Sequence, residues 1–140
     1  MRTRTIAYWT TTLIIAVELI SGAVLDLART GPTVATLHHL GYPTYLLSIL
    51  GPWRLLAAAA LLAPGLPRLK EWAYAGTFFE LTGAALSFAA VGGSTSNVVT
   101  PLLLAACAVA SWALRPPSRM LGVLSLPGIH AGRGSNGPAQ

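Results

Sequence analysis

The chain has 140 residues, a length that suits a single domain. Hydrophobic residues make up 54% of it and charged residues only 9%, and the mean hydropathy is +0.62. A soluble domain usually carries about 25% charged residues, so this chain has too few charges to cover a soluble surface. The composition excludes an ordinary soluble protein and indicates an integral membrane protein.

Four apolar segments follow one another along the chain: residues 6–27, 42–63, 72–91 and 98–114. Each is close to the roughly 20 residues that a helix needs to cross a bilayer. The first is too long for a signal peptide, and Glu18 interrupts it. The sequence therefore predicts an all-α fold, a four-helix transmembrane bundle over residues 1–114. Residues 115–140 are predicted to be a cytoplasmic tail, largely disordered because it is rich in Pro, Gly and Ser.

The net charge of +5 is distributed unevenly between the two sides of the predicted bundle. Basic residues lie before the first segment, between the second and third, and after the fourth: Arg2, Arg4, Arg68, Lys70, Arg115, Arg119 and Arg133. The loops on the other side hold only Arg29. Because positively charged loops stay in the cytoplasm, both termini are predicted to be cytoplasmic. The charges are also expected to attract anionic membrane lipid, and no basic patch suggests a nucleic-acid partner.

The first loop, residues 28–41, and the single cysteine offer little chemistry. The loop contains TVATLHHL, which could form a short helix at the membrane interface. His38 and His39 are adjacent, so their rings diverge, and no nearby acidic residue or cysteine completes a metal site. Cys107 has no partner for an internal disulfide and is expected to pack inside the bundle. No metal or cofactor ligand set is evident.

Three ionisable residues lie inside the predicted spans: Glu18, Arg54 and Glu80. At a rise of about 1.5 Å per residue they lie roughly 18, 14 and 12 Å from the cytoplasmic end of their helices. This similar depth allows one Glu–Arg–Glu cluster near the bilayer midplane. We take the three as the candidate catalytic residues.

Small and polar residues share a helix face with the two acidic residues, and such a face allows close helix packing or leaves room for a ligand. The predicted pocket-lining residues are Thr11, Ser21 and Gly22 in the first span, Trp53 in the second, and Gly76, Gly83 and Ser87 in the third. Trp53 suits either a pocket wall or simple packing, since it directly precedes Arg54.

A charge at the bilayer centre costs about 2.5–3.5 kcal/mol, so three charges should neutralise one another. One arginine between two carboxylates leaves one surplus negative charge, which favours protonation of one carboxyl group. A paired carboxylate beside a protonated carboxylic acid suits acid–base chemistry. The alternative is that the cluster only holds three helices together.

Several short motifs are also familiar: LGYP-x-Y (40–45), LG-x-x-R-LL (50–56), ALLAP (60–64), LPRLKEWAYAG (66–76) and F-E-L-TGA-x-LS (79–87). With these motifs, roughly residues 8–112 resemble the DoxX-like family of small bacterial integral membrane proteins. The resemblance implies a four-helix bundle, crossing the bacterial cytoplasmic membrane several times. It also implies a possible association with quinone- or thiol-linked redox complexes, with quinone as the one cofactor that the resemblance suggests.

The chain departs from the family pattern at three positions. Members usually carry lysine where Arg54 stands and histidine where Phe88 stands, whereas an acidic residue at the position of Glu80 is usual. The missing histidine speaks against a histidine-dependent redox role. Glu18 is not a typical family residue, so it would mark a specialised activity.

Three functions remain open at this point. The first is a redox-associated membrane subunit that binds a small lipophilic ligand and acts with a partner subunit or as a homo-oligomer. The second is a cofactor-free membrane enzyme that isomerises, cyclises or opens an epoxide of an isoprenoid-like substrate, with Glu18 and Glu80 as acid and base. The third is a small proton-coupled transporter of organic cations, against which Arg54 argues because a fixed positive charge repels cations.

Overall fold

The computed structural model describes residues 2–116, and that part of the chain is helical without a β-strand. Its elements are α1 (Arg2–Leu27), α2 (Gly31–His39), α3 (Tyr45–Leu62), α4 (Pro67–Ala90) and α5 (Thr95–Leu114). The all-α prediction is confirmed. The predicted disordered tail falls almost entirely on residues 117–140, outside the described part.

The four long helices correspond to the four apolar segments, with shifted ends. α4 begins at Pro67 rather than residue 72, because proline is well suited to the first turn of a helix, where its missing N–H has no helical partner. α3 begins at Tyr45 rather than residue 42, since Pro43 and Thr44 belong to the preceding turn. The additional helix is α2, which includes most of the segment TVATLHHL.

Three of the helices, α1, α3 and α5, are long and apolar enough to cross a membrane. α4 is long enough, but it is less apolar because it includes charged residues at its start, Glu80 in its middle, and several Gly, Thr and Ser residues. The membrane character of the chain is therefore carried by three helices. The fourth span stays a prediction.

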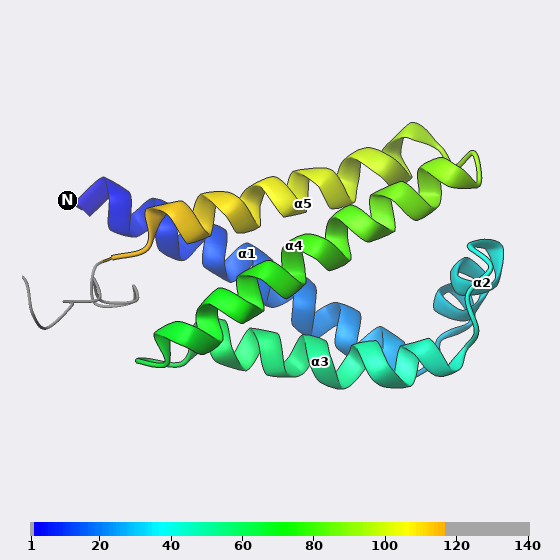
Figure 1. Cartoon of the computed structure of the whole chain (residues 1–140), viewed down its shortest axis with the longest axis horizontal. Coiled ribbons are helices and arrows are strands. Elements are labelled where there is room, and N and C mark those ends of the chain that lie inside the picture. Colours follow the sequence, from blue (N-terminus) through cyan, green and yellow to red (C-terminus); the bar gives the residue numbers. More distant parts are fainter. Residues whose placement is uncertain (1, 117–140) are drawn as a thin grey trace, which may run out of the picture.

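Each long helix packs against two others (Figure 1): α1 lies against α3 and α5, and α4 also lies against α3 and α5. The start of α1, the end of α5 and the α3–α4 turn lie at one end of the molecule. α2 and the α4–α5 turn lie at the other end. Most of the basic residues of the described part are thus gathered at the first end.

The core between the helices is built largely from small residues and a few larger ones. It contains Ile15, Leu19, Ala58, Ala60, Leu61, Ala73, Tyr74 and Ala108. The outward faces instead carry large apolar side chains, such as Leu86, 71% exposed, and Phe79, 70% exposed. An apolar exterior of this kind suits contact with lipid rather than water.

Lys70 joins the α3–α4 turn from inside the protein. Its side chain is fully buried, and Nζ donates to the carbonyl oxygens of Ala60 at 2.6 Å, Leu61 at 2.9 Å and Ala63 at 2.5 Å. The last carbonyls of a helix have no helical hydrogen-bond partner and carry a partial negative charge. An ammonium group donates hydrogen bonds to them and also balances that charge. Lys70 is therefore a helix cap as well as a positive charge on this side of the protein.

Candidate functional site

Arg54 lies at the centre of a charged cluster that joins three helices. Its Nε donates to Glu80 Oε1 of α4 at 2.5 Å, and its Nη1 lies 3.4 Å from Asp26 Oδ2 of α1. All three side chains are largely buried, and Asp26 is only 5% exposed as a residue. The structure thus brings Arg54 and Glu80 into direct contact.

Asp26 provides the second carboxylate that pairs with Arg54. Glu18 makes no ion pair with Arg54 in the part of the chain that the structure describes, but it lies near enough for the two charges to attract each other. Glu18 and Asp26 each lie four residues from Gly22, on opposite sides along α1. Both positions share the helix face that meets α3, so sequence spacing suits either of them. In the structure, the ion pair of Arg54 with α1 is formed by Asp26.

Gly22 makes this arrangement possible. A β-carbon built at residue 22 would overlap Arg54 Nη1 and lie 3.0 Å from Cζ. The guanidinium group therefore occupies the space that any other residue would fill with its side chain. This is the kind of room that the small residues of the first span were expected to provide.

A cavity of about 320 Å³ lies between α3 and α4 beside this cluster. Its lining is mostly apolar and comes from one stripe of each helix: Leu50, Trp53, Leu56, Ala57 and Ala60 of α3, and Leu69, Trp72, Ala73, Gly76, Thr77 and Glu80 of α4. Two of the predicted pocket residues, Trp53 and Gly76, are among them. A β-carbon at Gly76 would meet no atom within 4 Å, so the absent side chain leaves real space there.

The cavity has few polar groups. Glu80 is its one titratable lining residue in the described chain, and the hydroxyl of Thr77 is buried without a hydrogen-bond partner there. At its edge, Trp53 and Trp72 are 65% and 79% exposed. An apolar cavity with one or two polar groups is the usual form of a site for a small lipophilic molecule.

The remaining predicted pocket residues do not line this cavity. The hydroxyls of Thr11 and Ser21 bond to backbone oxygens of their own helix, at 2.8 Å and 3.1 Å. Ser87 donates to the Gly83 carbonyl at 2.8 Å and also bonds to Tyr42 Oη at 2.8 Å, near the end of α4. The structure therefore divides the predicted residues between the Arg54 cluster, the cavity and separate positions.

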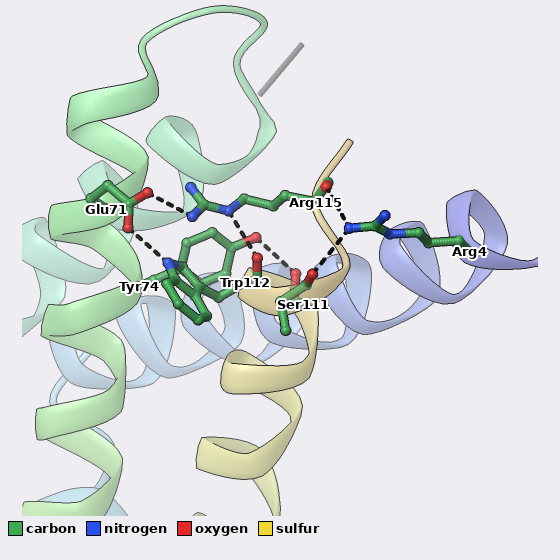
Figure 2. Close-up of polar contacts among 7 residues, drawn as sticks. Arg4, Glu71, Tyr74, Ser111, Trp112 and Arg115 are labelled. Carbon is green, nitrogen blue, oxygen red and sulfur yellow. Dashed lines mark hydrogen bonds and ion pairs between the residues drawn. The ribbon is translucent and has the colours of Figure 1, made fainter. Parts of the chain in front are cut away.

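A second group of polar residues, missed in the sequence, lies at the end of the molecule that holds the N-terminus (Figure 2). The Glu71 carboxylate accepts from Arg115 Nη2 at 2.6 Å and from the Trp112 indole at 2.7 Å. The guanidinium of Arg115 also lies 5.3 Å from the centre of the Tyr74 ring. Burial alone would raise the pKa of Glu71, but the hydrogen bonds from Trp112 and Arg115 outweigh it and place the pKa below its usual value.

Beneath this group, a buried chain of hydroxyls connects three helices. Tyr74 Oη and Ser111 Oγ lie 2.7 Å apart (Figure 2). Ser111 Oγ also lies 2.7 Å from Thr12 Oγ1. Thr12 in turn donates to the Tyr8 carbonyl at 2.7 Å. A smaller cavity of about 240 Å³, which Glu71 and Tyr74 help to line, lies nearby between α4 and α5.

These contacts give a structural reason for the KEWAYAG motif, residues 70–76. Lys70 caps α3, Glu71 binds Arg115 and Trp112, Tyr74 binds Ser111, and Gly76 opens the cavity.

Within the described residues, no group of three His, Cys, Asp or Glu side chains is placed to hold a metal ion. Cys107 is free and packs against the core.

Residues 10–111 match the sequence profile of the DoxX-like family, which covers more than half of the chain. No match was found among curated proteins, and none among solved structures.

Proposed function

The chain belongs to the DoxX-like family, and from that premise we propose that it binds a small lipophilic ligand in the cavity between α3 and α4. The proposal includes a four-helix bundle that crosses the bacterial cytoplasmic membrane, with both termini in the cytoplasm. Its single strongest support is the apolar cavity of about 320 Å³ that ends at Glu80, the partner of Arg54.

The topology is supported by the distribution of charge. Arg2, Arg4, Arg68 and Arg115 belong to elements at one end of the molecule, and Arg29 lies at the other. Positively charged ends remain in the cytoplasm. α4 completes the bundle because it packs between α3 and α5, and its central Glu80 forms an ion pair with Arg54.

The position of the cavity suits a ligand that arrives from lipid. Its edge is formed by Trp53 and Trp72, which face away from the protein core. A water-soluble ligand would gain little from this apolar edge. A lipophilic molecule with one polar group would instead leave the bilayer sideways and place that group at Glu80.

Ligand binding is favoured over acid–base catalysis by the number of titratable groups. A reaction that needs both an acid and a base requires two such groups facing the substrate. Among the described lining residues only Glu80 is titratable, and Asp26 lies behind Arg54, outside the cavity lining. A role as a redox-associated subunit remains compatible with ligand binding and would require a partner subunit that supplies the electron chemistry.

The test is to purify the protein from native membranes and identify the small molecules that come with it by mass spectrometry. Gly76→Leu should fill the cavity, because the position is open and lines it. Gly83→Leu is the matched control, since Gly83 is on the same helix, is equally open and lies outside the cavity lining.

We expect one lipophilic compound to accompany the parent protein and Gly83→Leu and to be lost from Gly76→Leu. Equal amounts in all three preparations would rule out the cavity as the binding site. For the topology, single cysteines placed at Arg29 and Arg68 in a Cys107→Ser background should react with a membrane-impermeant thiol reagent from opposite sides of the membrane.

A further inference from the structure

The charges around Arg54 do not balance. One guanidinium group meets two carboxylates, those of Asp26 and Glu80. Asp26 Oδ2 is buried and has no hydrogen-bond partner within the described residues; its only compensation is Arg54 Nη1 at 3.4 Å. With both carboxyl groups ionised, the cluster carries one surplus negative charge in a region where an unpaired charge is costly.

Glu80 is the member of the cluster that presents this charge to the cavity. Its Oε1 accepts from Arg54 Nε, whereas no described residue donates to Oε2. The Glu80 side chain is 23% exposed and lines the cavity. Arg54 is not among the described lining residues, so no positive group faces the cavity to compensate the free oxygen.

The other walls determine what kind of molecule fits beside this oxygen. Trp53 and Trp72 each contribute an indole ring, one from α3 and one from α4. Indole faces attract cations, and most of the remaining lining is apolar. A carboxylate acceptor, aromatic rings and hydrocarbon walls together match a cation attached to a hydrocarbon group.

We propose that the ligand of this cavity is a lipophilic amine, bound as its ammonium ion. Its N–H groups donate to Glu80 Oε2, and its hydrocarbon part lies against the apolar residues near Trp53 and Trp72. This inference rests on the proposed ligand-binding function and names the ligand class. A carboxylate would be repelled by Glu80. A quinone has only hydrogen-bond acceptors, so it could accept from the Thr77 hydroxyl but could donate nothing to the Glu80 carboxylate.

The test compares four probes by isothermal titration calorimetry: octylamine, octanol, octanoate and tetramethylbenzoquinone. The protein is held in nanodiscs of zwitterionic lipid, and the signal from empty nanodiscs is subtracted. A hydrogen bond to a charged group is strong enough that octylamine should bind about tenfold or more tightly than octanol. Octanoate should show no saturable binding, and the quinone should bind more weakly than octylamine, since it can donate nothing to Glu80.

Glu80→Gln should weaken octylamine binding to the level of octanol and leave octanol unchanged. The inference is overturned if octylamine binds no better than octanol to the parent protein, or if its advantage survives in Glu80→Gln. Because Glu80→Gln also takes a charge away from Arg54, the Gly76→Leu and Gly83→Leu pair provides a test with the charged cluster intact.

The glycine pair separates the two levels of the proposal. Loss of octylamine binding in Gly76→Leu, but not in Gly83→Leu, places the amine in the cavity as proposed. A different result overturns only the ligand class: octylamine binds the parent no more tightly than octanol, and Gly76→Leu loses octanol or quinone binding. The cavity then remains a binding site. Unchanged binding of every probe in Gly76→Leu overturns both.

Discussion

Arg54 lies directly over Gly22, so that its guanidinium group fills the space where a side chain at position 22 would begin. This close approach lets an arginine on α3 reach Asp26 on α1 while it keeps its contact with Glu80 on α4. The arrangement of the charged cluster therefore depends on an uncharged residue.

Gly22→Ala should destabilise the protein although alanine favours helices. The new β-carbon would displace Arg54 from contacts with two carboxylates, and overpacking of this kind costs about 1–3 kcal/mol. Gly83→Ala, on α4 with open space around it, should instead stabilise by about 0.5–1 kcal/mol. Unfolding in mixed micelles of increasing SDS content measures both, and a stable Gly22→Ala protein would show that Arg54 has another place to go.

Asp26→Asn should change the free energy of unfolding by about 1 kcal/mol or less, because Arg54 keeps Glu80 while a buried carboxylate without a hydrogen bond is removed. Glu18→Gln should likewise change it by about 1 kcal/mol or less, since Glu18 makes no ion pair within the described chain and acts on Arg54 only at longer range. The same SDS titration compares the two variants. A larger effect of Glu18→Gln would return the cluster to the Glu–Arg–Glu arrangement that the sequence suggested.

Lys70→Met should be among the most destabilising single substitutions, with a loss of about 3 kcal/mol. Methionine retains the length of the side chain, but the carbonyl oxygens of Ala60, Leu61 and Ala63 would lose their ammonium partner inside the protein. Arg68→Met is the control, because Arg68 is exposed and lies two residues away. Thermal unfolding in detergent should separate the two, and equal midpoints would contradict a capping role for Lys70.

Stability should fall in acid partly through Glu71, which precedes the predicted third span. Its pKa is below the usual value of 4.5 in the folded protein, so the folded state holds its carboxylate more strongly than the unfolded state does. That stabilisation is present above pH 4.5 and is lost as the pH falls through the lower, folded-state pKa.

The measurement is the thermal midpoint of the parent protein and of Glu71→Gln from pH 7 downward. Because glutamine does not titrate, Glu71→Gln should lose less stability over the acid range than the parent. Parallel curves would mean that the contacts with Arg115 and Trp112 add nothing to the folded state.

The sequence alone was sufficient for the features that depend on local pattern. Helix length and apolar composition identified the long helices, and the segment TVATLHHL indicated the helix that became α2. The motifs in residues 40–87 identified the family. Arg54 and Glu80 could be paired in advance because opposite charges inside a membrane helix bundle need each other and their depths agree.

The sequence alone could not predict which side chains pair between helices. That depends on how each helix is rotated and how far it is shifted along its neighbours. Glu18 and Asp26 have the same spacing from Gly22, and the depth count favoured Glu18 because Asp26 is near the end of the first segment, so it did not anticipate the contact of Asp26 with Arg54. Lys70 could be seen as a cytoplasmic charge, but its burial against three carbonyls of α3 follows from the turn that folds α4 back. Sequence determined which residues had to find partners, and only the packing of the helices decided which partners they found, because side-chain contacts between helices form over distances too short for periodicity to specify.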